Sequence, residues 1–289
     1  MKVREALLEG AARLAGKSAT PNLDAELILC WLRDWDRIQT ILKADEVLQP
    51  DDEIRYSELI EERRAGRPVQ YITGRQEFMG MLFCVDSRVL IPRPDTENLV
   101  EAVLERLKGV VGARVLDLCT GSGAIAVSLA RYLEGAEVIG TDLSGEALEV
   151  ARENGNRLVP GANLRWLQGD LYDALGSEAG LFDAIVSNPP YIAREVIETL
   201  EPNVRDYEPY GALDGGETGL DFYPLLVAGA GDRLAPGGLL ALEIGWDQGA
   251  AVCALLEEDG RFQEVELLKD LAGRDRVVCG KRRAVSGVR

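Results

Sequence analysis

The amino-acid sequence predicts an α/β fold: a mostly parallel, seven-stranded sheet with helices on both faces and an antiparallel C-terminal hairpin, preceded by a small all-α domain. Two observations predict this architecture. From residue 114 onward, short apolar runs alternate with helical patterns, which is typical of parallel sheets covered by helices. In the N-terminal part, apolar residues recur at helical spacing. The length of 289 residues allows one large domain or two unequal ones, and we expect two.

Residues 1–73 are predicted to form a helical bundle. Its first two apolar stripes consist of Val3, Leu7, Ala11 and Leu14, and of Leu23, Leu27, Ile28, Trp31 and Leu32. Thr20 stands as the N-cap of the second helix, and Pro21 occupies the first helical position, where its missing N–H costs nothing. A third stripe ends near Gly66 and contains Ile54, Leu59 and Ile60. Together the stripes indicate a small helical domain.

Residues 74–92 are predicted to form a β-hairpin linker. Short β-like pieces such as 81–85 are separated there by glycines and by other turn-forming residues. The domain that follows is expected to span residues 93–284. Its first helix is predicted to open at Pro94 or Thr96.

The sheet of this second domain is predicted from its apolar runs. Five strand-like runs alternate with helical patterns, at residues 114–118, 137–141, 164–167, 182–186 and 238–243. Two further runs, at 264–268 and 276–279, come close together without a helix between them. A connection that short cannot join parallel strands, so this last pair should be antiparallel.

The composition excludes several classes of function. The formal net charge is −17 and the pI is near 4.6, so we expect no broad basic footprint on a phosphate backbone and no direct nucleic-acid binding. The sequence contains no histidine, which excludes Ser-His-Asp and Cys-His catalysis and histidine-ligated metals. The five cysteines are scattered without a C-x-x-C pair, so neither a disulfide framework nor a zinc site is indicated, and no metal is expected.

The sequence carries no recognisable targeting or membrane signal. Residues 1–6 include an acid and lack an apolar h-region, and no later stretch reaches the roughly 18 apolar residues of a membrane span. We therefore expect a soluble, cytoplasmic protein that does not bind membranes.

The run at 114–118 leads through a glycine-containing loop into the helical pattern 124–130. The candidate cofactor-binding residues of this loop are Asp117, Cys119, Thr120, Gly121, Ser122 and Gly123. Glycines permit positive φ and close backbone approach, and the N-terminus of the helix presents N–H groups to an anionic ligand group. A tight turn without a ligand is the competing interpretation, but the strand–loop–helix context favours a nucleotide site.

Two acidic residues follow the next two strands. Asp142 ends the second strand, roughly 20 residues beyond the loop, where a carboxylate can accept both ribose hydroxyls. Asp170 follows the third strand and can accept from an adenine amino group, with Leu171 beside it to cover the ring. Taken alone, each acid is more typical of a solvated carboxylate at a strand end than of a ligand site. At the carboxyl ends of successive parallel strands, they form a constellation.

The ligand that fits this constellation is a single nucleoside carrying an amino-acid tail. A dinucleotide fits less well, because the run G-S-G-A-I-A departs from G-x-G-x-x-G. Asp117 can face the ammonium group of the tail, directly or through water. The loop and the helix N-terminus can meet the carboxylate of the tail.

The fourth strand ends in a loop whose candidate catalytic and substrate-binding residues are Asn188, Pro189, Pro190 and Tyr191. Two adjacent prolines remove two N–H donors, so the backbone offers carbonyl acceptors. The Asn188 carboxamide oxygen and the Pro189 carbonyl can accept both protons of an NH2 group while the Tyr191 ring lies against it. Such acceptors assist attack of a weakly nucleophilic nitrogen on a sulfonium methyl group without a strong base. A merely rigid turn is the alternative interpretation.

Four further blocks identify a family, at residues 67–74, 90–97, 188–192 and 208–220. On these blocks and the glycine loop, the chain resembles the HemK/PrmC family, the N5-glutamine methyltransferases that modify the Gly-Gly-Gln glutamine of peptide-chain release factors. The resemblance covers nearly the whole chain. Asn-Pro-Pro-Tyr alone is shared with adenine-N6 and cytosine-N4 DNA methyltransferases, whereas the other blocks are specific. The chain departs from the family at Cys119, where members often carry glycine.

The resemblance implies a class I, Rossmann-like methyltransferase domain that uses S-adenosyl-L-methionine and releases S-adenosyl-L-homocysteine. It implies that residues 1–73 help to recognise a class 1 release factor. Apart from the resemblance, we expect the enzyme to be a monomer. The resemblance also implies that Asp142 binds ribose and that Asn188, beside the cofactor, positions the glutamine amide together with Tyr191. Arg93 is expected to grip the substrate loop or shape the site, with an interdomain structural role as the alternative.

Three competing functions share parts of this pattern. A DNA amino-methyltransferase shares the chemistry, but the acidic composition counts against it. A nicotinamide-dependent oxidoreductase shares the sheet, but the irregular glycine run counts against it. A non-catalytic S-adenosylmethionine-binding protein would not need the acceptor loop at residues 188–191.

Overall fold

The computed structural model describes residues 1–176 and 180–284, and the chain divides into two compact units. The smaller unit comprises Met1–Arg75 and Glu201–Tyr207, and the larger comprises Gln76–Leu200 and the residues from Glu208 onward. The sequence placed the end of the helical domain at residue 73 and a separate linker at 74–92, whereas the larger unit here begins at Gln76. No sequence pattern predicted that residues 201–207 pack with the helical unit.

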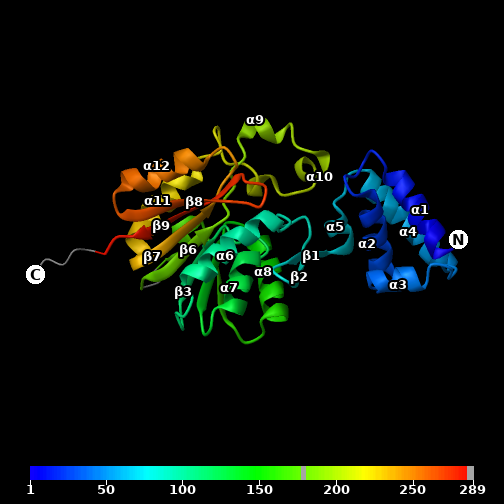
Figure 1. Cartoon of the computed structure of the whole chain (residues 1–289), viewed down its shortest axis with the longest axis horizontal. Helices are drawn as coiled ribbons and strands as arrows, with labels where there is room; N and C mark the ends of the chain where they lie inside the picture. The colour runs from blue at the N-terminus through cyan, green and yellow to red at the C-terminus, as the bar shows by residue number, and fades with distance from the viewer. Residues whose placement is uncertain (177–179, 285–289) are drawn as a thin grey trace, which may run out of the picture. The chain divides into compact units, whose positions relative to one another are not determined.

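The smaller unit is helical (Figure 1). Its helices are α1 (Val3–Leu14), α2 (Pro21–Arg33), α3 (Arg37–Leu42), α4 (Pro50–Arg64), α5 (Val69–Thr73) and α10 (Pro202–Arg205). Helix α2 begins as expected, with Thr20 at the N-cap and Pro21 at N1. Gly10 lets α4 approach α1 closely, because a Cβ at this position would lie 2.3 Å from the Tyr56 hydroxyl.

One residue of the third predicted stripe does not face the core of the smaller unit. Leu59 and Ile60 are fully buried, but Ile54 is 60% exposed. Ile54 lies five positions before Leu59, which is about 140° around the helix, so the two cannot share a face.

The core of the smaller unit also contains an ion pair, in which Arg63 Nε lies 2.6 Å from Asp24 Oδ2 and both side chains are buried.

The larger unit begins with the predicted hairpin. Strands β1 (Arg75–Phe78) and β2 (Met81–Cys84) form a two-stranded sheet. The rings of Phe78 and Phe83 meet edge to face at 6.0 Å and are fully buried in the core of the larger unit. These rings anchor the hairpin to the helices beside the main sheet.

The main sheet has seven strands in the order β5-β4-β3-β6-β7-β9-β8. They are β3 (Arg114–Leu118), β4 (Glu137–Asp142), β5 (Asn163–Gln168), β6 (Phe182–Ser187), β7 (Leu234–Glu243), β8 (Phe262–Lys269) and β9 (Asp275–Arg282). The pairs from β5 to β7 are parallel, and β9 is antiparallel to both β7 and β8. This confirms the predicted sheet and its C-terminal hairpin.

Helices cover both faces of the main sheet (Figure 1). One face carries η1 (Pro94–Thr96), α6 (Glu97–Arg106), α7 (Ala124–Tyr132) and α8 (Gly145–Leu158). The other carries η2 (Leu171–Leu175), α11 (Phe222–Arg233) and α12 (Gly249–Asp259). Short elements α9 (Arg194–Ile197) and η3 (Tyr210–Ala212) lie in the long segment between β6 and α11.

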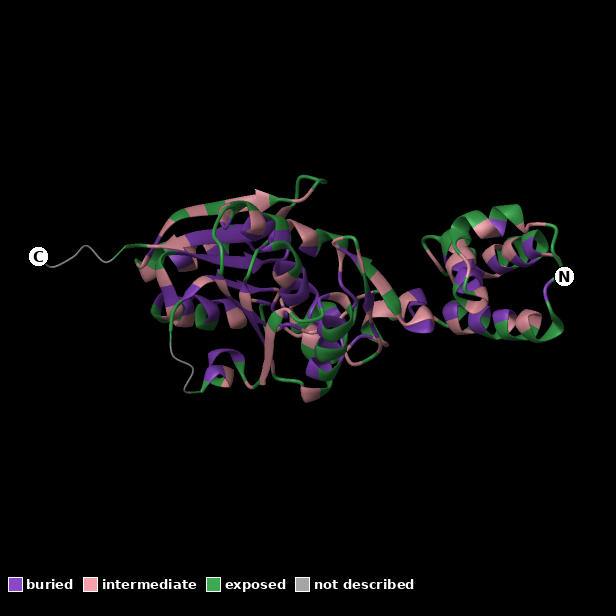
Figure 2. Cartoon of the chain, turned by 90° about the horizontal axis from the view of Figure 1, so that it is seen from below, coloured by how far each residue is buried: buried purple, intermediate pink, exposed green. Residues whose placement is uncertain are grey.

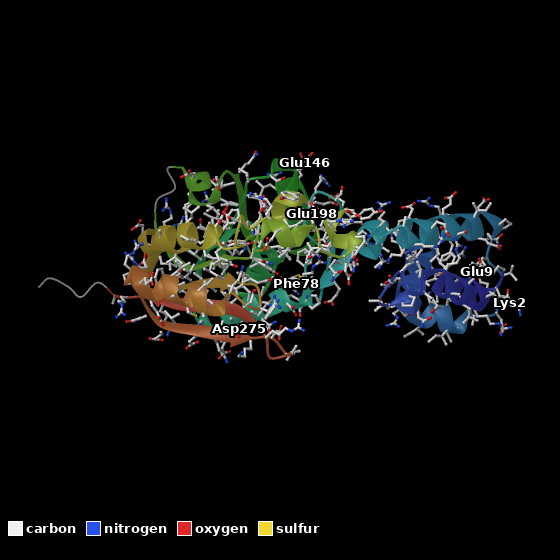
Figure 3. The ribbon with its side chains drawn as sticks, turned by 90° about the horizontal axis from the view of Figure 1, so that it is seen from above. Lys2, Glu9, Phe78, Glu146, Glu198 and Asp275 are labelled. Atoms are coloured by element: carbon white, nitrogen blue, oxygen red, sulfur yellow. The ribbon has the colours of Figure 1, made fainter. Side chains whose placement is uncertain are left out.

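Burial follows these layers. The central strands of the larger unit are buried (Figure 2), because alternate side chains pack into the helices of the two faces. The side chains of Glu146 and Glu198, which are labelled in Figure 3, are exposed. The chain order reverses beside β3, since β4 and β5 extend the sheet on one side and β6 pairs on the other. Ligands bind open α/β sheets at such a point.

Candidate active site

A cavity of about 370 Å³ lies at the carboxyl ends of the parallel strands of the larger unit. This size suits a small organic ligand. Seven predicted site residues line it: Cys119, Gly121, Asp142, Asp170, Leu171, Asn188 and Pro190. The other predicted residues are not among the lining: Asp117, Thr120, Ser122, Gly123, Pro189, Tyr191 and Arg93. Two segments that were not predicted to contribute also line the cavity, with Arg88, Val89, Leu90, Pro209, Gly211 and Ala212.

Strand pairing brings the glycine loop and the acceptor loop together. Leu118 at the end of β3 is level with Ser187 at the end of β6, so Cys119 and Asn188 leave the sheet side by side. The Ser187 hydroxyl donates to the Leu118 carbonyl over 2.8 Å and ties the two ends. The two loops that the sequence assigned to cofactor and to chemistry therefore form one wall of one cavity.

Asp117 lies beneath the glycine loop. Its Oδ2 accepts from the Thr120 hydroxyl over 2.5 Å and from the Ala126 N–H over 3.1 Å. Its Oδ1 is buried and has no hydrogen-bond partner among the described residues. Burial raises the pKa of Asp117 from 3.8 to about 7. A ligand ammonium group would stabilise this buried carboxylate, because it would give the unpaired oxygen a charged hydrogen-bond donor.

Asp142, the last residue of β4, contacts the same loop. Its two carboxylate oxygens accept from the Gly121 N–H and from the Ser144 N–H, each over 2.9 Å. Burial raises its pKa. The Gly121 N–H and the Ala126 N–H thus already donate to protein carboxylates, those of Asp142 and Asp117, in this structure. The glycine loop is shaped by the protein's own carboxylates.

Two residues of the cavity wall have left-handed backbone conformations. Cys119 has φ of 60° and Leu171 has φ of 43°. Such values cost a residue other than glycine roughly 1–2 kcal/mol. Burial raises the pKa of the Cys119 thiol, so it remains protonated and uncharged. Strain retained at a ligand cavity is typical of a functional site.

A buried asparagine that the sequence did not single out supports the glycine loop. Asn154 on α8 accepts from the Cys84 N–H over 2.7 Å and donates to the Cys84 carbonyl over 3.0 Å. It also donates to the Ser122 carbonyl over 3.0 Å. One side chain thus joins the hairpin strand β2 to the loop beside the cavity. No local sequence pattern marks a polar residue in the middle of a helix as part of a site, so Asn154 could not be predicted.

Asn188 and Tyr191 are held by residues far away in the sequence. The Asn188 amide nitrogen donates to the Thr96 hydroxyl over 3.2 Å, which leaves the carboxamide oxygen as the end available to a ligand. The Tyr191 hydroxyl lies 3.4 Å from Glu243 Oε1 at the end of β7. Burial raises the pKa of Tyr191, so its hydroxyl stays protonated. Thr96 and Glu243 were not predicted as site residues.

Arg93 forms an ion pair with Glu208, whose side chain is 1% exposed. Glu208 also accepts from the Ile91 N–H over 3.4 Å. These contacts bind the segment before η1 to the segment that contributes Pro209 to the cavity wall. This geometry supports a role in shaping the site.

Among the described residues, no cluster of acidic or cysteine side chains has the arrangement of a metal site. Within the same residues, no helix is both long and apolar enough to cross a membrane.

The strand order, with β9 inserted antiparallel between β7 and β8, and the cavity at the β3–β6 switch point define a class I methyltransferase. Residues 115–205 match the family described as Methyltransferase domain. The crystal structure of a methyltransferase from Pyrococcus furiosus is similar over 80% of this chain and 99% of that chain, with a TM-score of 0.52. At 20% identity, this likeness shows the fold alone.

The family follows from more similar sequences. Residues 5–74 match the family described as PrmC N-terminal domain. A release factor glutamine methyltransferase from Moorella thermoacetica is 48% identical, covering 98% of this chain and 99% of the relative. One from Clostridium acetobutylicum is 40% identical with the same coverage. The chain belongs to the release factor glutamine methyltransferase family.

Proposed function

We propose that this chain transfers a methyl group from S-adenosyl-L-methionine to the side-chain amide nitrogen, N5, of the Gly-Gly-Gln glutamine in class 1 peptide-chain release factors, and thereby tunes translation termination. The names of the similar relatives support this substrate. The observation that carries the chemistry is the pairing of Leu118 with Ser187, which sets the acceptor loop beside the glycine loop. Methyl donor and amide would then meet in one cavity.

The residues around the cavity fit S-adenosyl-L-methionine part by part. Asp117 Oδ1, which has no hydrogen-bond partner among the described residues, can accept from the ammonium group of the cofactor, directly or through water. Asp142 lines the cavity and can accept from the ribose hydroxyls, and Asp170 and Leu171, which also line it, can hold the adenine. Bound there, the cofactor supplies an electrophilic methyl group and leaves as S-adenosyl-L-homocysteine when the N–C bond forms and the C–S bond breaks.

The protein's contribution to the transfer is orientation and charge stabilisation. An amide nitrogen is a weak nucleophile because its lone pair is delocalised. The Asn188 carboxamide oxygen and the Pro189 carbonyl accept from its two N–H bonds, which keeps the lone pair in line with the methyl group and stabilises the developing positive charge. Once alkylated, the nitrogen is acidic enough to pass a proton to water. A histidine base is not required.

The smaller unit fits a role in recognising the release factor, since its residues match the PrmC N-terminal domain. We further propose that the enzyme works as a monomer in the cytoplasm and without direct contact to nucleic acid. The net charge of −17 supports the last point, because phosphate-backbone binding needs clustered positive charge.

The test is transfer of radiolabelled methyl from S-adenosyl-L-methionine to a purified release factor. The acceptor is compared with a version in which the Gly-Gly-Gln glutamine is replaced by alanine, and the enzyme with Asn188→Ala. Label confined to the native acceptor and the unmutated enzyme is the expected result. Label on the alanine acceptor, or on DNA offered instead, would refute the proposal.

A further inference from the structure

The acceptor loop at residues 188–191 offers few backbone groups by which the protein can hold it. Pro189 and Pro190 have no N–H group, so neither can donate a hydrogen bond to the surrounding structure. In the proposed function, the Pro189 carbonyl accepts from the substrate amide. The loop must therefore be held through its other carbonyl groups or at its ends, and a buried side chain does this at the Tyr191 carbonyl.

That side chain is Gln248, which donates to two backbone carbonyls. Its Nε2 lies 2.9 Å from the Tyr191 carbonyl oxygen and 3.1 Å from the Gly219 carbonyl oxygen. Gln248 directly precedes α12 and is 8% exposed. The NH2 group has two protons, so each carbonyl receives one of them.

The orientation of the Gln248 carboxamide follows from its partners. Gln248 Oε1 lies 2.8 Å from the Gly245 N–H, which can only donate, whereas the two carbonyls can only accept. A carboxamide turned by a half-turn would set its NH2 group against the Gly245 N–H and its oxygen against both carbonyls. The Tyr223 hydroxyl, 3.2 Å from Oε1, can donate to the same oxygen. The carboxamide is therefore held in one orientation.

The second carbonyl belongs to a segment, residues 213–219, that packs directly on the acceptor loop. The Ile192 N–H donates to the Leu213 carbonyl over 3.0 Å, and the Gly215 N–H donates to the Ile192 carbonyl over 2.9 Å. A Cβ at Gly215 would lie 2.7 Å from Tyr191 Cα, so only glycine allows this close approach. One side chain, that of Gln248, thus joins this segment to the acceptor loop and to the residues that follow β7.

We infer that Gln248 is a positioning residue, which holds the acceptor loop against the segment 213–219 so that the acceptors for the substrate NH2 group are correctly placed. This inference rests on the proposed function. Gln248 is not among the residues that line the cavity, so it acts through the Tyr191 backbone. It follows β7, whereas Asp142 and Asp170 follow or end strands on the other side of β3. Its loss should therefore impair methyl transfer more than cofactor binding.

The first test replaces Gln248 by methionine, which has a similar size but no N–H donor. The assay uses the full-length enzyme, saturating S-adenosyl-L-methionine and a purified release factor, below the temperature at which any variant begins to unfold. Gln248→Met should lower kcat about 10- to 100-fold, because a displacement of about 1 Å in a positioning group can cost that much. The Kd of S-adenosyl-L-homocysteine should change by less than about three-fold.

The matched control is Tyr223→Phe, which removes a buried hydroxyl from the same cluster. Both donors of Gln248 stay in place in this variant, and Gln248 Oε1 keeps the Gly245 N–H as a partner. Its kcat should remain within about three-fold of the wild type even if its melting temperature falls. The comparison separates loss of the donors from general damage to the cluster.

A second pair of variants tests the same contact without altering Gln248. In Gly219→Ala, the new Cβ would clash with the Tyr191 carbonyl oxygen and lie 2.8 Å from Gln248 Nε2, which would force donor and acceptor apart. This variant should lower kcat as Gln248→Met does, with S-adenosyl-L-homocysteine binding retained. The control is Gly237→Ala, where φ is +80° against +78° at Gly219 but no atom lies within 4 Å of the new Cβ. Its kcat should match the wild type.

Three results would overturn the inference. They are a kcat of Gln248→Met within about three-fold of the wild type, an equal loss of kcat in Tyr223→Phe, and a loss of S-adenosyl-L-homocysteine affinity as large as the loss of kcat. If Gln248→Met does not fold, Gly219→Ala decides, and a kcat equal to that of Gly237→Ala overturns the inference. A wild type without any methyl transfer would instead refute the proposed function itself.

Discussion

Replacement of Asp117 by asparagine separates the stability of the empty protein from its ability to bind the cofactor. Asp117 is fully buried, and one of its oxygens has no partner among the described residues. Burial raises its pKa from 3.8 to about 7. A carboxylate that is harder to ionise when folded than when unfolded destabilises the fold at high pH.

The magnitude follows from the pKa difference. Below pH 3.8 the group is protonated in both states and costs nothing. Between 3.8 and about 7 the folded state binds more protons, so the free energy of unfolding falls as pH rises. At about 1.4 kcal/mol per pKa unit, the full penalty above pH 7 is about 4 kcal/mol. An asparagine side chain would avoid this penalty. It would place an NH2 group at the position of Asp117 Oδ1, where a buried donor without a partner costs about 1–2 kcal/mol.

Asp117→Asn should therefore stabilise the ligand-free protein by about 2–3 kcal/mol at about pH 8.5 and destabilise it slightly near pH 4. Urea unfolding at several pH values measures this difference. The same variant should bind S-adenosyl-L-homocysteine at least about 10-fold more weakly, because the ammonium group loses its anionic partner.

The control is Asp183→Asn, in which the replaced carboxylate accepts from the Arg114 N–H over 2.8 Å away from the cavity wall. It should leave the affinity for S-adenosyl-L-homocysteine unchanged. Parallel pH profiles for wild type and Asp117→Asn, or unchanged affinity in Asp117→Asn, would refute the reasoning.

Three further predictions concern other parts of the chain. Asn188→Ala should lower kcat about 100- to 1000-fold while the protein still binds S-adenosyl-L-homocysteine, as steady-state kinetics and calorimetry would show; a kcat within about ten-fold of wild type would contradict this. Gly123→Ala should destabilise by about 2–3 kcal/mol in urea unfolding, because φ is +78° and a Cβ would lie 3.0 Å from the Trp166 ring. Gly161→Ala, with φ of +83° and open space around it, should cost only the backbone part, about 1 kcal/mol, and equal losses would show that the Trp166 contact contributes nothing. Arg63→Met should destabilise the smaller unit by about 3 kcal/mol, because it removes the only cationic partner of buried Asp24 among the described residues and leaves it the Ser18 and Thr20 hydroxyls; a loss below about 1 kcal/mol in thermal unfolding would count against the ion pair.

The sequence predicted those features that depend on local periodicity. The apolar runs gave the strands of the main sheet, and Pro21 after Thr20 marked the start of α2. The residues at strand ends were predicted for the same reason, since Asp142 directly follows the run 137–141 and Asn188 lies two positions after the run 182–186. Once the runs are strands of a parallel sheet, their carboxyl ends meet at one edge.

Features that depend on contacts between distant segments were missed. Thr96 and Asn188 are 92 positions apart, and Tyr191 and Glu243 are 52 apart. For Glu243 a signal existed, because it ends the apolar run 238–243 just as Asp117 and Asp142 end or nearly end theirs. Treating every carboxylate at a strand end as a candidate would have found it.

Ile54 shows the opposite error, in which an apolar residue was assigned to a stripe by composition although its angular position on α4 excludes it. The packing of 201–207 with the helical unit left no periodic pattern at all.

The most direct test of the account is to locate the transferred methyl group. A release factor treated with the enzyme and S-adenosyl-L-methionine would be digested, and tandem mass spectrometry would assign the modified atom in the Gly-Gly-Gln peptide. The account predicts one added methyl group on the glutamine side-chain nitrogen, absent when the enzyme carries Asn188→Ala. A methyl group on another residue, or the same yield with Asn188→Ala, would contradict it.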